Sequence, residues 1–147
     1  FSSDGDSALA VVDLTEAYAE SASSVQRGIR ITDSRRSVLV QDEILLKQVS
    51  SIVWGITTDA DIELLSDSEA KLTADGKHLY VKFLVGAVTL EAKDAPQTTP
   101  PAYSNEGVKR LEASVEGSGD VRLSVLLSPE WSDGHTSSCE VIPLSNW

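Results

Sequence analysis

The sequence predicts an all-β protein, an antiparallel β-sandwich of about ten short strands. Apolar and polar residues alternate with a period of two in one segment after another, and turn residues separate these segments at regular spacing. Helical periodicity is almost absent. The 147 residues fit one domain, residues 1–147, which is large enough to bury a core of its own.

The composition excludes two classes of partner. A formal net charge of -11 and a sequence pI near 4.4 give the molecule a field that repels nucleic acid and other polyanions. No apolar run approaches the roughly 20 residues that a membrane-spanning helix needs. We therefore expect neither nucleic acid nor a membrane among its partners.

The region from Val25 to Thr58 has a strong strand pattern, and we expect the other strands to flank it. Residues 25–32 alternate, the segment 33–36 has turn chemistry, and a second strand begins at Val38, so a β-hairpin is expected. Polar residues at 47–51 then predict a break before a third strand, 52–58, which is rich in β-forming residues. The region predicts a three-stranded meander with a buried Trp54.

The residues before this region are less regular. Phe1 to Ser7 is polar and predicts a flexible terminus, whereas the apolar run Ala8 to Leu14 predicts a strand. The Ala/Ser/Glu-rich segment 15–24 fits either a short helical turn or an irregular loop. Because the chain starts at Phe1 and contains no methionine, we expect a processed product or an excised part of a longer protein.

The second half predicts two hairpins and two further strands. Asp75-Gly76 predicts a type I′ turn in the hairpin Leu72–Phe83. The segments 108–115 and 121–127 predict another hairpin around Gly117-Ser118-Gly119-Asp120. Further expectations are a strand at 85–92, a proline-rich loop at 94–103 and one last short strand within 131–147. The alternation places these side chains in the core: Trp54, Leu79, Val81, Phe83, Leu111, Leu123 and Val125.

Short motifs, in a fixed order, resemble one known family. They are Asp13-Leu14-Thr15 with Ala17-Tyr18, Arg27-Gly28, Val38 to Glu43, Val53-Trp54-Gly55 with Thr57-Thr58, Asn105-Glu106-Gly107-Val108 with Leu111, and Leu126-Leu127-Ser128-Pro129. Together they resemble the C-terminal β region of heparinase II/III-like polysaccharide lyases, over roughly Gly5 to Pro129. The resemblance implies a β-sandwich, an irregular loop and not a helical turn at residues 15–24, and a secreted or periplasmic setting. It also implies a catalytic His-Gly-His-type stretch with metal ligands upstream of the matched region.

The sequence predicts no catalytic, cofactor-binding or metal-ligating residue in this chain. Elimination from a uronate needs a convergent acid–base set and a group that neutralises the carboxylate, and no pattern brings His78 and His135 together. The acidic groups Asp4 and Asp6, and Asp59, Asp61 and Glu63, lack the spacing of a calcium loop. Exposed trios such as His78, Tyr80 and Lys82, and the arginines Arg27, Arg30, Arg35 and Arg36, could contact an acidic sugar but are better explained as solvated surface.

Two further predictions concern partners. Cys139 is the only cysteine, so it is either a free thiol or the partner of a segment outside this chain. Taken with the family resemblance, the sequence predicts a non-catalytic β domain that braces the catalytic domain of a larger lyase, with a possible polysaccharide contact. The alternatives are an independent carbohydrate-binding module and a purely structural interaction domain.

Overall fold

The computed structural model describes residues 1–3, 5–96 and 105–147 and confirms the predicted all-β class. Within these residues nine strands form one antiparallel sheet that does not close on itself, in the order β1-β2-β3-β4-β9-β7-β6-β5, with β8 paired to β9. The strands are β1 (Ser2–Ser3), β2 (Ala8–Asp13), β3 (Ala22–Thr32), β4 (Ser37–Thr58), β5 (Asp61–Ser66), β6 (Glu69–Ala74), β7 (Lys77–Val85), β8 (Thr89–Asp94) and β9 (Lys109–Pro129). Two short 3-10 helices, η1 (Thr15–Tyr18) and η2 (Leu144–Asn146), complete the elements of the described residues.

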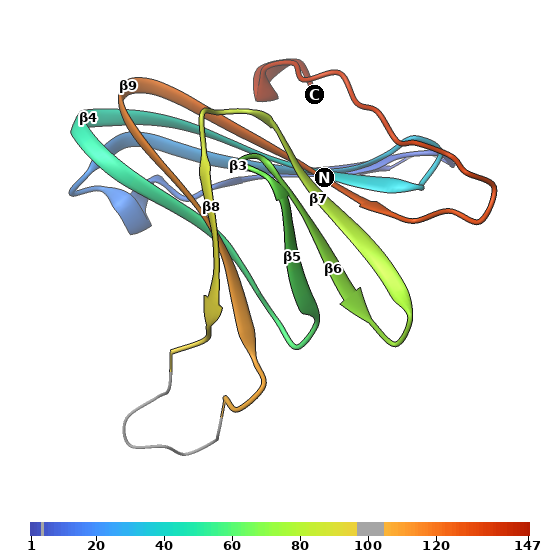
Figure 1. The fold of residues 1–147 in the computed structure, drawn as a ribbon. Helices are drawn as coiled ribbons and strands as arrows, with labels where there is room; N and C mark the ends of the chain where they lie inside the picture. The colour runs from blue at the N-terminus through green and yellow to red at the C-terminus, as the bar shows by residue number, and fades with distance from the viewer. Residues whose placement is uncertain (4, 97–104) are drawn as a thin grey trace.

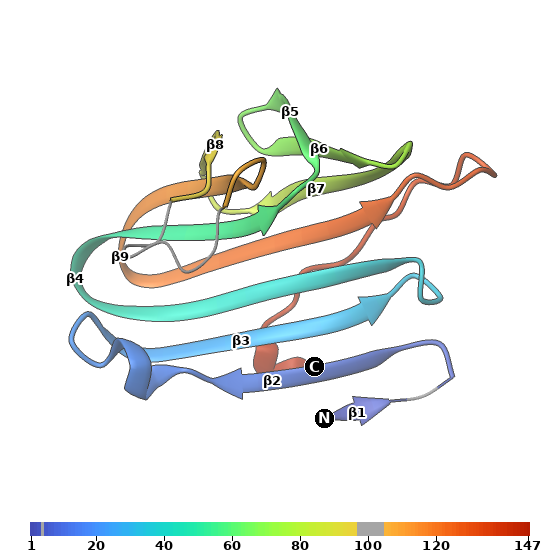
Figure 2. The same cartoon turned by 90° about the horizontal axis from the view of Figure 1, so that it is seen from below.

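The two longest strands correct two predictions. β4 continues through the polar segment 47–51, where a break was expected, and β9 continues through Gly117 to Asp120, where a hairpin turn was expected. The two strands pair with each other on both sides of this point, and the register shifts between Leu46 and Ser50. Gly119 has a φ of 63°, which suits a β-bulge within a strand as well as a turn between strands. Figure 2 shows β4 and β9 curving back together at one end.

This bend folds the sheet into two layers (Figure 1). The later part of β4, the early part of β9 and β8 face the later part of β9 with β7, β6 and β5, and the main core lies between them. All seven predicted core residues belong to it, with Leu79 only partly buried. Trp54 and Phe83 meet edge to face at 5.4 Å between ring centroids. The predicted strand faces are therefore confirmed.

The first three strands extend one layer beyond this core. β1 pairs with β2, so the terminus that was expected to be flexible begins with a short strand. The predicted hairpin joins β3 to β4, and its turn residues Asp33, Ser34 and Arg35 have positive φ. Between β2 and β3 the chain forms η1, which matches the helical-turn alternative for residues 15–24.

The hairpin between β6 and β7 is confirmed, with φ of 51° at Asp75 and 71° at Gly76. The next strand differs from its predicted bounds, because β7 extends to Val85 and β8 begins only at Thr89, after Gly86 with a φ of 109°. The predicted loop 94–103 lies mostly outside the described residues. Its described part differs from the prediction at Asp94, which ends β8.

The C-terminal segment 131–147 contains no strand, which corrects the last prediction of the sequence. It crosses the outer face of the sheet instead (Figure 1). Gln41 Nε2 donates to the carbonyl of Ile142 at 2.8 Å, and the backbone N–H of Leu144 donates to Glu43 at 3.1 Å. These bonds hold the segment to β4 through side chains, so it needs no strand pairing. We call residues 131–147 the C-terminal strap.

Candidate docking pocket and a second hollow

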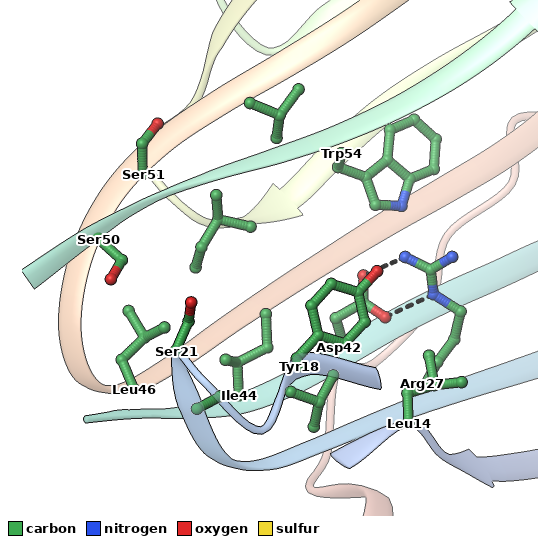
Figure 3. A pocket seen from close by; sticks show the side chains of 14 residues that line it. Leu14, Tyr18, Ser21, Arg27, Asp42, Ile44, Leu46, Ser50, Ser51 and Trp54 are labelled. Atoms are coloured by element: carbon green, nitrogen blue, oxygen red, sulfur yellow. Dashed lines mark hydrogen bonds and ion pairs between the residues drawn. The ribbon is translucent and has the colours of Figure 1, made fainter. Parts of the chain in front are cut away.

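A pocket opens on the inner face of the sheet, beside the main core. Strands β3 and β4 form its floor, the returning part of β4 forms one wall, and the segment after β2 forms the other (Figure 3). Its volume is about 200 Å³. The lining residues are Leu14, Tyr18, Ser21, Ala22, Val25, Arg27, Asp42, Ile44, Leu46, Ser50, Ser51, Ile52, Val53 and Trp54. We call this set the docking pocket.

An ion pair closes one end of the docking pocket. Arg27 donates from Nε and Nη2 to the two carboxylate oxygens of Asp42, at 2.6 and 2.7 Å. The Asp42 side chain is 7% exposed and that of Arg27 is 40% exposed. The hydrogen bond to Asp42 raises the pKa of Arg27, so the guanidinium stays charged. Because the two charges cancel, the pocket holds no net charge in its lining.

Tyr18 projects from η1 toward this ion pair (Figure 3). Its backbone is held by the turn before β3, where the N–H of Ser21 donates to the Tyr18 carbonyl at 3.0 Å. Tyr18 is 54% exposed, although the floor beneath it, at Ala22, Val25 and Leu46, is buried. The pocket is thus an apolar recess with an aromatic rim.

Exposed apolar side chains continue the same face. Val12 lies opposite Arg27 in the register of β2 and β3, and Ala10 lies opposite Ile29. Val12 is 49% exposed and Ile29 is 45% exposed. Since alternate residues of a strand share a face, these side chains lie on the face that carries Arg27 and the pocket. We call the docking pocket together with Val12 and Ile29 the apolar face.

A second hollow lies where the strap leaves β9. It is lined by Glu69, Tyr80, Ser128, Pro129, Glu130, Trp131, Gly134, His135, Thr136 and Ser137. His135 Nε2 lies 2.5 Å from Asp33, and this hydrogen bond holds the pKa of Asp33 below its ordinary value. Among the described residues that line the hollow none is lysine or arginine, whereas two are glutamates. Tyr80 and His135 therefore line one hollow whose own lining supplies no cation for a uronate carboxylate, and Lys82 beside it pairs with Glu69 at 3.9 Å.

The two histidines line different hollows. His78 Nδ1 is 3.0 Å from the Thr73 hydroxyl, and its Nε2 is 3.8 Å from Glu130. Its ring lines a third, shallow hollow and is not part of the lining that contains Tyr80 and His135. The trio His78, Tyr80 and Lys82 thus forms no single site, although its members share one side of β7.

Arg27, Arg30 and Arg36 have separate structural partners. Arg36 pairs with Asp133 at 2.9 Å and stacks over Trp131 at 5.3 Å, and Arg30 lies over Trp147 at 4.8 Å. Arg30 also approaches the Cys139 sulfur at 3.3 Å, and that cysteine is a free thiol in this structure. Arg30 and Arg36 therefore join the strap to the sheet, and Arg27 pairs with Asp42 in the pocket.

The described residues contain neither a metal-binding cluster nor a membrane-spanning helix. Within residues 1–3, 5–96 and 105–147, no three side chains of His, Cys, Asp or Glu come close enough to ligate a metal ion. Asp4 lies outside this part of the chain. No helix in the same part is long and apolar enough to cross a membrane.

Sequence reasoning missed the docking pocket, because its walls come from segments that meet only through the bend of β4. One signal was present. Arg27 stands between Val25 and Ile29 on a strand face that is otherwise apolar, and a charge in such a position needs a buried partner or a function.

Comparisons with known proteins bear on the fold. No protein-family model matches the sequence, and no curated protein matches it. A heparan sulfate lyase HepC mutant from Pedobacter heparinus matches 87% of this chain with a TM-score of 0.64 at 14% identity. A heparinase III with methylated lysines matches 86% with a TM-score of 0.63, also at 14% identity. The shared feature is the fold. This chain spans only 20% of the length of either protein.

Proposed function

We propose that this chain is a non-catalytic β domain of a heparinase II/III-like polysaccharide lyase. In that protein another part carries β-elimination on a uronate-containing polysaccharide, and this domain braces the catalytic part. One observation carries the proposal: nearly the whole chain shares a fold with about a fifth of two heparinases. The parent protein would act outside the cytoplasm, in a secreted or periplasmic setting.

The described side chains support the non-catalytic part of the proposal. Elimination requires a base for the C5 proton, an acid for the departing oxygen and a cation for the carboxylate in one place. In the second hollow Tyr80 and His135 are accompanied by Glu69 and Glu130. Neither glutamate can neutralise the carboxylate of a uronate, Lys82 already pairs with Glu69 at 3.9 Å, and Asp33 holds the imidazole of His135.

The apolar face supports the bracing part. Val12, Tyr18 and Ile29 are each at least 40% exposed and are large apolar or aromatic side chains. Contiguous exposed apolar groups of this kind mark surfaces that another protein surface covers.

The test has two arms. The purified chain is incubated with heparin, heparan sulfate and alginate while the ultraviolet absorbance of unsaturated uronate ends is followed, and we expect none to form. Separately, the chain is mixed with the catalytic part of the parent protein, and we expect a stable complex by sedimentation and a higher melting temperature of that part. Product formation by the chain alone, or no association with the catalytic part, would overturn the proposal.

A second candidate function is carbohydrate binding at the second hollow. Tyr80 and Trp131 contribute aromatic surface there, next to the hydroxyl-bearing Ser128 and Thr136. Calorimetric titration with neutral and acidic oligosaccharides tests it. Binding without turnover that Tyr80→Ala abolishes would favour a carbohydrate-binding module over a bracing domain.

A further inference from the structure

We propose that the docking pocket receives one large apolar side chain from a basic segment of the domain that this chain braces. The proposal rests on the function proposed above and deepens it, because it names the contact surface and the chemistry of the partner. Three observations carry it: the size and lining of the pocket, the absence of net charge within it, and the acidic rim around it.

The size of the pocket selects the inserted group. Its volume of about 200 Å³ is below the roughly 300–1,000 Å³ of pockets that enclose drug-sized molecules. One aromatic or branched aliphatic side chain is of the right scale. Its floor is aliphatic, at Val25, Ile44 and Leu46, so insertion removes apolar surface from water on both partners.

The charged groups of the pocket are paired with each other and leave no charge for a charged ligand to bind. Arg27 and Asp42 satisfy each other in two parallel hydrogen bonds, and an inserted ion would have no unpaired counter-charge in the lining. Tyr18 stands at the mouth, more than half exposed. Aromatic residues beside desolvated recesses are the usual anchors of protein interfaces, and the exposed Tyr18 can close over an inserted side chain.

The rim selects the charge of the partner. Glu16 and Glu20 are exposed on the segment between β2 and β3, and Leu14, Tyr18 and Ser21 of this segment line one wall of the pocket. The ammonium of Lys47 donates to the carbonyl of Ala19 and adds one positive charge beside these two carboxylates, so the three side chains together remain negative. With a whole-chain net charge of -11, the field at this mouth attracts cationic groups and repels anionic ones. The occupant is therefore a basic polypeptide segment with an apolar anchor.

The probe is a capped synthetic peptide, acetyl-Lys-Lys-Phe-Lys-Lys-amide, titrated into the isotopically labelled full chain and followed by amide and indole chemical shifts. Control peptides replace Phe by Ser, or every Lys by Glu. We expect saturable shifts at Tyr18, Val25 and Trp54 with the first peptide, at least tenfold weaker binding of the Ser peptide, and no binding of the Glu peptide. Added salt should weaken the first interaction.

Two matched pairs of variants locate the binding. Ser21→Trp fills the pocket, and its control Ser145→Trp places the same side chain at an exposed position on the strap. Glu16→Lys changes the rim charge, and its control Asp67→Lys makes the same change of charge in the exposed turn between β5 and β6. We expect the first member of each pair to reduce affinity by fivefold or more and the controls to leave it within twofold.

The possible results separate this inference from the proposed function. No saturable shift with the Phe peptide, equal binding of the Ser peptide, or pocket shifts produced instead by a neutral oligosaccharide would each overturn the inference. If the chain still associates with the catalytic part, and Ser21→Trp leaves that association unchanged, the bracing function stands and only the proposed contact is wrong. Loss of association for the unmodified chain would overturn the function itself.

Discussion

Single residues of the core determine how tightly the two layers hold together. Phe83 on β7 and Trp54 on β4 come from opposite layers, are each 6% exposed, and meet edge to face. Each ring therefore contacts apolar neighbours that its own strand does not provide. Removing one leaves a cavity that the rigid strands around it fill only partly.

Phe83→Ala should lower the free energy of unfolding by about 3–5 kcal/mol, which is the usual cost of truncating a buried aromatic side chain. Urea denaturation followed by circular dichroism measures it. Val53→Ala is the control, because Val53 is 51% exposed and should change the free energy by less than about 0.5 kcal/mol. Equal effects of the two substitutions would show that the core does not lie between these layers.

Asp42→Asn should destabilise the protein by about 1–3 kcal/mol, because it leaves the Arg27 guanidinium half-buried without its carboxylate. The cost stays below that of a fully buried pair because water still reaches Arg27. The double substitution Arg27→Met with Asp42→Leu should recover much of the loss, since no unpaired charge remains. A double variant as unstable as the sum of its single variants would contradict this account. Urea denaturation of the unmodified chain, Asp42→Asn, the single variants Arg27→Met and Asp42→Leu, and the double variant supplies every value of this comparison.

At the scale of elements, the bend shared by β4 and β9 folds the sheet into two layers. Gly119 adopts a φ of 63° inside β9, and nothing lies within 4 Å of the position that a Cβ would occupy there. The position is therefore constrained by the backbone and not by crowding. Gly119→Ala should cost about 1 kcal/mol of unfolding free energy, from the strain of a left-handed backbone.

Gly5→Ala is the matched control for that substitution. A Cβ at Gly5 also meets nothing within 4 Å, and no positive φ constrains this residue. Thermal unfolding of the two variants measures the difference. If Gly119→Ala were as stable as Gly5→Ala, the bend would not depend on the left-handed residue.

The strap should loosen at acid pH. The pKa of Asp33 is lowered by its hydrogen bond to His135, and that of Asp133 is lowered by the backbone N–H of His135 and by Arg36. A depressed folded-state pKa contributes stability above the ordinary value of 3.8, and that stability is lost as the pH falls through the folded-state value. The indole signal of Trp131 should therefore shift as the pH falls below about 4.

The variant Asp33→Asn tests which group is responsible. It removes one titrating carboxylate, so its Trp131 signal should show a smaller acid transition than the unmodified chain. Asp59→Asn, at an exposed position away from the strap, is the control and should leave the transition unchanged. A transition that both variants leave unaltered would mean that Asp33 does not hold the strap.

At the scale of the whole molecule, β4 and β9 each run through both layers. Their pairing joins the extended part of the sheet, with β1 to β3, to the two-layered part that contains the main core. Neither part keeps a complete sheet if these two strands separate. We therefore expect one cooperative unfolding transition.

This expectation is tested by comparing the urea unfolding transitions that two spectroscopic probes report. Tryptophan fluorescence reports the core around Trp54 together with the strap at Trp131 and Trp147. Far-ultraviolet circular dichroism reports all strands, and the two midpoints in urea should agree within error. A second, earlier transition in circular dichroism alone would show that β1 to β3 unfold separately. A chain lacking Phe1 to Ser3 is the control, because β1 pairs with only two residues of β2 and should not alter cooperativity.

The local sequence determined the strand-forming segments, the turn at Asp75-Gly76 and the faces of the core strands. These features depend on interactions between near neighbours: alternation selects a face, and positive φ selects Gly or Asp at a turn. The same alternation runs on both sides of Gly117 to Asp120, so it predicts a hairpin and a bent strand equally well. Only the pairing of β9 with β4 on both sides of the bend distinguishes them.

The docking pocket and the position of the strap were decided by tertiary structure alone. Leu14, Arg27 and Trp54 line one recess because the bend returns β4 over β3. The strap can approach β3 closely at Gly28, because glycine has no Cβ. A Cβ at this position would clash with the side chains of Leu144 and Trp147. Such contacts join residues that are far apart in the chain, and their energies depend on shape and distance in the folded state. A one-dimensional pattern records the chemistry of each side chain but not which distant side chain it will meet.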